Sequence, residues 1–489
     1  MSEQEENKEA LILNDDDDDF LLDDDLFIKE KKKHKILMLS DHPLYPSGVG
    51  VQARFLIEGL VKTGKFSFRC LGGAIKHQNY NTIQVNEDFI IKPVDGFGNP
   101  DILRQLLVTE KPDAILIFTD PRQFIWLFEM EDEIRSICPI TYWHIWDNDP
   151  YPDFNRPFYD ATDLINCISY KTFELVKPHY PEKTNYITHA FPKETYFPIS
   201  KPERDKLLVE NFGDKKDWFK VLWVSRNATR KLPGDLFVSW KMFLDKLEEV
   251  HGHRNALLIM HTDPTDREGP NLLAVSEKFN LQENVWFSTN KLSFEHMNLL
   301  HNMSDACVSV SKNEGHGLSL TISLMVGKPI IALKTGGQTR QVEDYRDGSH
   351  NGVALEPSKR CLVGSQLVPY IYEDFYDHEE LVQAFLKVHD HTPEEKEKLS
   401  AKCLEYANHE FNIENMVSNW ADTLDKCIET FQNKPAKKWS CTKIELVSSK
   451  QKDATKTIGA TTLNVRQPVK AQQELVNMKQ KMKLQKVAL

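Results

Sequence analysis

The sequence predicts an α/β protein whose parallel sheets are distributed over more than one domain. Two segments, beginning near residues 35 and 305, each contain a short apolar run, a glycine-containing turn and a helix-length stretch. After the second helix, Gly327-Lys328-Pro329 provides a stop and Ile330–Leu333 the next buried strand. A chain of 489 residues is too long for one core, because domains usually contain roughly 100–200 residues.

The chain divides into six parts by composition and charge. In order, we expect an acidic disordered head (1–34), a first domain (35–198), a linker (199–217), a second domain (218–410), a final helix (411–432) and a basic tail (433–489). Residues 1–28 contain twelve acids and one lysine, whereas residues 433–489 contain thirteen basic residues and three acids. Blocks of like charge bury too little apolar surface to fold.

Both ends leave alternatives open. For the acidic head, the alternative to disorder is a contact with calcium or with another protein. In the tail, Ala471, Leu475, Met478 and Met482 fall on one helical face among lysines, which fits a membrane-surface or partner-binding helix as well as a helix packed on its own domain.

Composition excludes several protein classes. No apolar run reaches the roughly 18–20 residues that span a bilayer, and the acidic N-terminus lacks the pattern of a signal peptide. We therefore expect a cytoplasmic protein with no transmembrane segment. The eight cysteines contain no Cys-x-x-Cys and no His/Cys cluster with metal spacing, so they are interpreted as reduced structural thiols.

The first domain begins with a strand (35–40), a glycine turn and a helix (51–61). Gly48, Gly50 and Ala53 fit the Gly-x-Gly-x-x-Ala dinucleotide fingerprint. That fingerprint needs an acid at the end of the second strand, but the strand at 66–71 runs into Gly72-Gly73. NAD binding is therefore disfavoured.

A later strand of this domain (139–146) ends in aromatic and acidic residues, among them Trp143, Asp147 and Asp149. Aromatic rings beside carboxylates suit a sugar, whose ring faces stack and whose hydroxyls need acceptors. Alternation along a strand also predicts that Trp143 or Trp146 packs in the core.

The second domain places charged residues after its strands. Arg226 and Lys231 follow the strand at 221–225, ahead of a helix that Pro233 starts. Glu314 follows the strand at 305–311, just before another helix. One carboxylate beside a helix N-terminus at the carboxyl edge of a parallel sheet suits a ligand with hydroxyls and phosphate, such as a nucleotide sugar.

Three elements in register carry a family resemblance. They are Glu-Gly-x-Gly-Leu at 314–318, Gly-Lys-Pro-Ile-Ile at 327–331 and Gly-Gly at 336–337. The chain resembles the retaining glycosyltransferases of family GT4 (group 1) over roughly residues 35–430, most strongly at 221–355. The resemblance implies the GT-B fold, in which two Rossmann-like domains face each other across a cleft and the final helix crosses back to the first domain.

The resemblance also implies site residues. Arg226 and Lys231 would grip the donor diphosphate, Glu314 would orient the sugar, and His144 would face it. The other implied donor-binding residues are Gly48, Gly50, His316, Gly317, Leu318, Gly336 and Gly337, with the Gly317 and Leu318 amides capping a phosphate.

No metal and no cofactor other than the nucleotide-sugar donor are expected. Asp147 and Asp149 have the Asp-x-Asp spacing with which single-domain glycosyltransferases hold a metal. The two-domain fold instead uses basic side chains and helix N-termini, and charge-assisted hydrogen bonds of about 1.5–3 kcal/mol each suffice. Trp143, Asp147 and Asp149 are therefore acceptor candidates.

Two positions depart from the family pattern. The second acid of the Glu-x7-Glu motif, which usually contacts the ribose, would stand at Ile322. Either another residue holds the ribose, with Ser319, Ser323, Glu343 and Asp344 as candidates, or nucleotide affinity is reduced. Arg340 stands where the family often has an acid.

The implied reaction is transfer of a sugar from a nucleoside diphosphate to an acceptor hydroxyl with retention. A glycan or small molecule is the favoured acceptor. Residues 143–150 and 351–370 look similar to transferases of some large tailed phages, which leaves modified DNA bases as an alternative. The basic tail would then contact an anionic acceptor or partner. A non-catalytic sugar- or partner-binding protein on the same fold is the other alternative.

Overall fold

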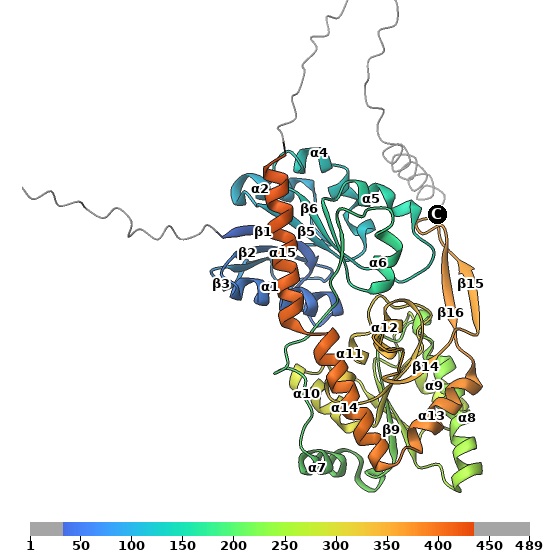
Figure 1. Cartoon of the computed structure of the whole chain (residues 1–489). Helices are drawn as coiled ribbons and strands as arrows, with labels where there is room; N and C mark the ends of the chain where they lie inside the picture. Colours follow the sequence, from blue (N-terminus) through green and yellow to red (C-terminus); the bar gives the residue numbers. More distant parts are fainter. Residues whose placement is uncertain (1–32, 435–489) are drawn as a thin grey trace, which may run out of the picture.

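The computed structural model describes residues 33–434, which form two domains, each built around a parallel sheet (Figure 1). The first sheet has the strand order β3-β4-β2-β1-β5-β6-β7-β8, and the second has the order β11-β10-β9-β12-β13-β14. Only β3 runs antiparallel to its neighbour within these two sheets. The predicted α/β class is thus confirmed, and the predicted head and tail lie almost entirely outside the described residues.

The strands of the first sheet are β1 (His34–Asp41), β2 (Phe66–Gly73), β3 (Ile83–Asn86), β4 (Phe89–Pro93), β5 (Ala114–Phe118), β6 (Ile140–His144), β7 (Leu164–Cys167) and β8 (Thr184–Tyr186). The second sheet contains β9 (Phe219–Val224), β10 (Ala256–His261), β11 (Val285–Ser288), β12 (Ala306–Ser309), β13 (Ile330–Leu333) and β14 (Gly352–Leu355). A separate antiparallel hairpin consists of β15 (Lys359–Val363) and β16 (Ile371–Phe375).

The helices of the first domain are α1 (Gly48–Lys62), α2 (Pro100–Glu110), α3 (Ile125–Phe128), α4 (Glu131–Ile134), α5 (Arg156–Asp160) and α6 (Tyr170–Val176). Then follow α7 (Lys201–Phe212), α8 (Pro233–His251), α9 (Leu272–Lys278), α10 (Phe294–Met303), α11 (Leu318–Met325), α12 (Thr339–Val342), α13 (His378–His389), α14 (Pro393–Glu410) and α15 (Ile413–Gln432). None of the described helices is long and apolar enough to cross a membrane.

Most predicted strands and helices are found within a few residues of their expected bounds. The expected linker at 199–217 differs, because α7 occupies most of it. Ser200 caps this helix by accepting a hydrogen bond from the Glu203 amide. Leu208 and Phe212 are buried against the second sheet, so the segment is an ordered part of that domain.

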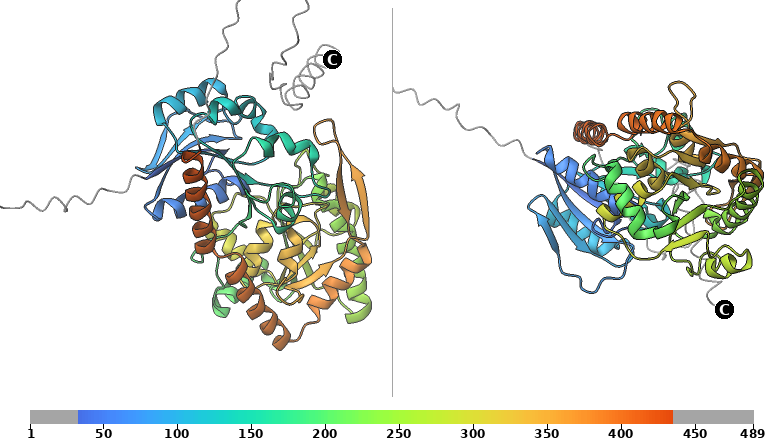
Figure 2. Two further views of the ribbon diagram at one scale, coloured as in Figure 1. Left: turned by 45° about the horizontal axis from the view of Figure 1, so that its top comes forward. Right: turned by 90° about the horizontal axis from the view of Figure 1, so that it is seen from below.

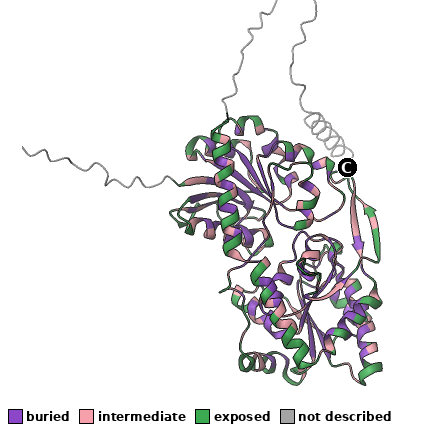
Figure 3. Cartoon of the chain, viewed as in Figure 1, coloured by how far each residue is buried: buried purple, intermediate pink, exposed green. Residues whose placement is uncertain are grey.

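The final helix, α15, leaves the second domain and packs along the first (Figures 1 and 2). Asn412 caps it, and its buried face includes Trp420, Leu424 and Ile428. These side chains share a core with α1 and the first sheet. Figure 3 shows the same division in both domains, with buried strands inside and exposed outer helix faces.

A small apolar cluster between the domains includes Ile322. Its buried members are Phe55 of α1, Phe191 and Tyr196 from the segment after β8, and Ile322 and Val326 at α11. Ile322 is only 7% exposed. The position expected to carry a ribose-binding acid is thus part of an apolar contact that joins the two domains.

Ile322→Glu should lower the free energy of unfolding by about 3 kcal/mol, because a carboxylate among Phe55, Phe191 and Tyr196 loses its hydration without gaining a partner. Ile322→Leu keeps the volume and should change that free energy by less than about 1.5 kcal/mol. Urea unfolding of the two variants and the wild type measures both effects. Equal stability of the Glu and Leu variants, or tighter donor binding by the Glu variant, would show that this side chain faces the ligand.

Candidate functional site

Two adjoining cavities lie between the domains, and Asp147 lines both. The first, which we call the Glu314 cavity, has a volume of 270 Å³. It is lined by Asp41, Ser47, Gly48, Val49, Ile145, Asp147, Ile168, His189, Arg230, Glu314, Gly315, His316 and Leu318. The second, the Arg360 cavity, has a volume of 170 Å³ and is described below.

Close backbone packing of three loops forms the wall between the cavities. A Cβ atom at Gly337 would lie 2.0 Å from the Gly315 carbonyl oxygen, and one at Gly336 would lie 2.3 Å from that of Glu314. Gly336 also has a φ of +50°, which disfavours other residues. The Gly337 amide donates to the Glu314 carbonyl at 2.8 Å. The Gly337 amide is therefore already bonded, and the close packing of both glycines fixes the position of Glu314.

Glu314 is held by two basic residues from the loop between β9 and α8. Lys231 Nζ forms an ion pair with Glu314, and Arg230 Nη1 lies 3.7 Å from the same carboxylate. Arg230 also donates to the Asn313 carbonyl at 3.0 Å, which orients its guanidinium. Burial and the positive charge of Arg230 lower the pKa of Lys231, whereas the negative charge of Asp147 raises it and favours the charged form.

Arg226, which was predicted to grip the diphosphate, does not line either cavity. Its side chain is 59% exposed and pairs with Asp266 at 2.7 Å and Glu268 at 3.0 Å. Arg230 lines the Glu314 cavity instead. Nothing in the sequence pointed to Arg230, because the family spacing to Lys231 selects Arg226.

Asp147, the predicted acceptor candidate, brings a carboxylate of the first domain to both cavities. Burial raises its pKa, while the positive charges of Arg230 and Lys231 and a hydrogen bond from the Gly315 amide oppose this rise. Gly315 is needed here because a Cβ atom would lie 2.7 Å from Asp147 Oδ1. The acid therefore faces the cations of the second domain across the boundary.

Trp143 and His144 require correction, because both side chains leave the site. Trp143 is fully buried, stacked on Phe118 at 4.3 Å, and in edge contact with Trp420. His144 is also fully buried, and its Nε2 lies 2.7 Å from the Tyr159 hydroxyl. Burial lowers the pKa of His144 to about 3. Alternation along β6 sends these side chains into the cores on either side of the sheet.

Two other histidines line the Glu314 cavity, the predicted His316 and the unpredicted His189. Their rings lie 5.2 Å apart, and His316 Nε2 is 2.9 Å from the Thr321 hydroxyl. Burial lowers the pKa of both, to about 3 for His316, so both are neutral. His189 Nδ1 is buried and has no hydrogen-bond partner among the described residues.

The start of α11 also differs from the expectation. The Gly317 amide donates to Gln341 Oε1 at 3.1 Å, and Gln341 Nε2 donates back to the Gly317 carbonyl at 2.8 Å. The Gly317 amide is therefore already bonded to a side chain of α12. Leu318 instead packs close to Gly48, where an added Cβ would lie 3.0 Å from Leu318 Cδ1.

The glycine turn before α1 contributes its first glycine to the cavity but not its second. Gly48 lines the cavity. The Gly50 amide donates to the Ser47 hydroxyl, which caps α1 and donates in turn to Asp41 Oδ2 at 2.6 Å. A Cβ at Gly50 would lie 2.7 Å from the His42 and Tyr45 carbonyl oxygens. Gly50 thus shapes the turn, while Asp41 and Ser47 line the cavity although no sequence motif pointed to them.

The residues considered as substitutes for the ribose acid are all engaged elsewhere or outside the cavity. Ser323 contacts His301 Nδ1 at 2.8 Å in the core, Asp344 pairs with Arg346, and Glu343 pairs with Lys334. Neither these three residues nor Ser319 lines the Glu314 cavity.

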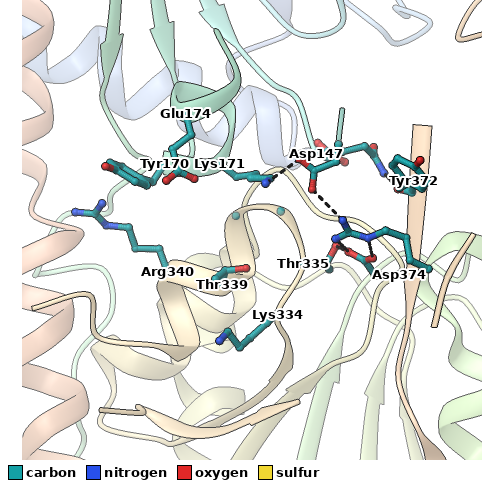
Figure 4. A pocket seen from close by; sticks show the side chains of 15 residues that line it. Asp147, Tyr170, Lys171, Glu174, Lys334, Thr335, Thr339, Arg340, Tyr372 and Asp374 are labelled. Carbon is teal, nitrogen blue, oxygen red and sulfur yellow. Dashed lines mark hydrogen bonds and ion pairs between the residues drawn. The ribbon is translucent and has the colours of Figure 1, made fainter. Parts of the chain in front are cut away.

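The Arg360 cavity contains charged side chains of both signs from both domains (Figure 4). Its lining residues are Asp147, Asn148, Asp149, Tyr170, Lys171, Glu174, Lys334, Thr335, Gly336, Gly337, Thr339, Arg340, Arg360, Tyr372 and Asp374. Asp149 is paired with Lys171 at 2.8 Å and Arg360 at 3.4 Å. This predicted acceptor residue therefore lies at a second, more polar cavity beside the first.

The β15–β16 hairpin closes this cavity, a role that nothing in the sequence indicated. The Tyr372 amide donates to the Asp149 carbonyl at 2.8 Å, and Asn148 Nδ2 donates to the Tyr372 carbonyl at 2.6 Å. Arg360 on β15 also binds Asp374 on β16 at 2.6 Å. The hairpin thus ties the loop after β6 in the first domain to the second domain.

Arg340, the second departure from the family pattern, also joins the domains. Its guanidinium lies 4.4 Å from the centre of the Tyr170 ring and 3.5 Å from that of Tyr345. It is paired with Glu410 at 2.9 Å, and the Tyr186 hydroxyl donates to the same carboxylate. A basic residue here therefore makes an interdomain contact that an acid would not make.

Comparison with known proteins agrees with the two-domain architecture described above. Residues 220–360, which contain Arg230, Lys231 and Glu314, match the family model described as Glycosyl transferases group 1. Sucrose-phosphate synthase from Thermosynechococcus elongatus has a similar structure, with a TM-score of 0.64 at 14% identity over 81% of this chain and 100% of that chain. No curated protein sequence matches the chain.

Two further solved structures are similar over the same extent. HepE from Anabaena in complex with UDP and glucose has a TM-score of 0.61 at 16% identity, over 80% of this chain and 100% of that chain. A glycosyltransferase from Rickettsia africae has a TM-score of 0.60 at 15% identity, over 81% of this chain and 99% of that chain. The chain therefore has the GT-B fold, and residues 220–360 of its second domain match the model of the group 1 glycosyl transferases.

Proposed function

We propose that this protein transfers a sugar from a nucleoside-diphosphate sugar to a hydroxyl of a glycan or small molecule, with retention and without a metal. One observation carries the proposal. Glu314 lies in a cavity between the two domains, with Lys231 and Arg230 directly beside it. A carboxylate that accepts from sugar hydroxyls and two cations that bind a diphosphate are the groups such a donor needs.

Donor binding would rearrange the charges in this cavity. Lys231 and Arg230 now neutralise Glu314, and a diphosphate would compete for the same cations. The carboxylate would then be free to accept hydrogen bonds from the sugar. His189, whose buried Nδ1 is unpartnered among the described residues, gives the cavity wall a further neutral polar group. The complex of HepE with UDP and glucose supports this class of donor.

The acceptor would approach through the Arg360 cavity, because Asp147 lines both cavities. The bond between the anomeric carbon and the phosphate oxygen breaks, the acceptor oxygen bonds to that carbon from the same face, and the departing phosphate takes the acceptor proton. Arg230 and Lys231 stabilise the charge that develops on the leaving diphosphate. Positioning of the two substrates supplies the rest of the rate.

Arg230→Ala and Lys231→Gln should each lower turnover at least about 100-fold, because each removes a cation that stabilises the leaving group. Arg226→Ala is the matched control and should lower turnover less than about fivefold, since its guanidinium is bound to Asp266 and Glu268 outside the cavity. Steady-state kinetics of the three variants with one donor measures these effects. If turnover fell 100-fold in the Arg226 variant alone, then Arg226, which the family spacing indicates, would be the residue that binds the diphosphate.

A screen of UDP-, GDP- and ADP-sugars, by hydrolysis and by thermal stabilisation, tests the function directly. We expect one nucleotide class to raise the melting temperature and to be hydrolysed, with turnover unchanged in excess EDTA at 25 °C.

Stabilisation without hydrolysis or transfer would identify a sugar-binding protein instead. Transfer to DNA containing modified bases, but to no glycan, would establish the alternative acceptor. Magnesium-reversible loss of turnover would assign a metal to the Asp147 and Asp149 pair.

A further inference from the structure

Two His-x-His sequences, far apart in the chain, meet on the surface of the second domain. His251-Gly-His253 ends α8, and His389-Asp390-His391 ends α13. Asp390 Oδ1 lies 3.0 Å from His251 Nε2 and 2.6 Å from His389 Nδ1. Three potential ligand atoms lie within 4.8 Å of one another, one each from His251, His389 and Asp390.

The fold brings these residues together through helix packing. Helices α8 and α13 share the core of the second domain, with the Trp240 and Phe385 rings 5.3 Å apart, and both end at the same level. Gly252 has a φ of +74°, which turns the chain after α8. The His253 ring then lies 6.0 Å from that of His251 and 6.1 Å from that of His389.

We propose that His251, His389 and Asp390 bind a divalent transition metal, for which Zn²⁺ is the best fit. Imidazole nitrogens and a carboxylate oxygen are zinc ligands, held about 2.0–2.2 Å from the ion in tetrahedral geometry. His253 or a water molecule would supply the fourth position. Mg²⁺ prefers an octahedron of oxygens and does not suit this set.

The surroundings favour a metal ion over a plain ion-pair cluster. The C-termini of α8 and α13 add partial negative charge at the same place. The His389 ring is fixed by edge contact with Phe219 at 5.4 Å, which limits the cost of ordering it.

The metal would have a structural role rather than a catalytic one. Phe219 begins β9, whereas the loop that carries Lys231 follows the other end of that strand. The cluster therefore lies at the opposite edge of the sheet from the cavities, about 20 Å away for a six-residue strand. It would join the ends of α8 and α13, both seen at the lower right of Figure 1, and stabilise the folded domain by mass action.

The test uses the full-length protein without a histidine tag, from which metal is removed with EDTA and the EDTA by dialysis. Binding of ZnCl2 is then measured by calorimetry, and its effect on stability by thermal melting. We expect one Zn²⁺ site that raises the melting temperature, whereas the same concentration of MgCl2 does not raise it. CoCl2 should give the visible absorption of a tetrahedral site. Donor hydrolysis at 25 °C should not change with Zn²⁺ removal, which separates this proposal from the proposed function.

His251→Gln and Asp390→Asn should each weaken Zn²⁺ affinity at least tenfold while melting like the wild type in EDTA. His296→Gln is the matched control, because His296 is exposed on α10 and contacts only Ser293 among the described hydrogen bonds. This variant should bind Zn²⁺ as the wild type does. No Zn²⁺-dependent rise in melting temperature, or wild-type affinity in both cluster variants, would overturn the proposal.

Discussion

The site depends on the close approach of three backbone segments at the domain boundary, which glycine alone permits. Gly315, Gly336 and Gly337 let the loop after β12, the loop after β13 and the Asp147 segment pack against one another. At each position a Cβ atom would collide with a backbone or carboxylate oxygen. The Glu314 backbone is fixed as a result, and its side chain is directed toward Lys231 and Arg230.

This arrangement brings opposite charges together at the domain boundary. Glu314 pairs with Lys231 and Arg230 within the second domain, and Asp147 faces the same two cations from the first domain. Removing Glu314 would leave the largely buried Lys231 without its closest partner, which costs several kcal/mol in typical proteins. A ligand that brings its own negative charge can replace Glu314 as the partner of the cations, and this exchange is the physical basis of the proposed diphosphate site.

Several contacts other than the site hold the two domains together. The apolar cluster around Ile322 lies on one side, the β15–β16 hairpin bonds to the loop after β6, and Arg340 stacks on tyrosines of both domains. Helix α15 adds a continuous apolar face against the first domain. The apolar cluster fills the place where the family pattern expects a ribose acid, at Ile322. A nucleoside in this protein would therefore be held by groups that line the cavities rather than by a carboxylate at position 322.

The sequence by itself determined the α/β class and the strand and helix order near the site. Strands such as β13 and the glycine turns follow from local patterns, since apolar runs and turn residues act over a few neighbours. The family resemblance pointed to Lys231 and Glu314 but not to Arg230. The tertiary structure decided which side chains face the cavities. Alternation along β6 did not say which face of the sheet Trp143 and His144 would meet, and spacing alone selected Arg226 over Arg230. The joining of the two His-x-His pairs and the hairpin contact depend on packing between segments more than a hundred residues apart, which no local pattern encodes.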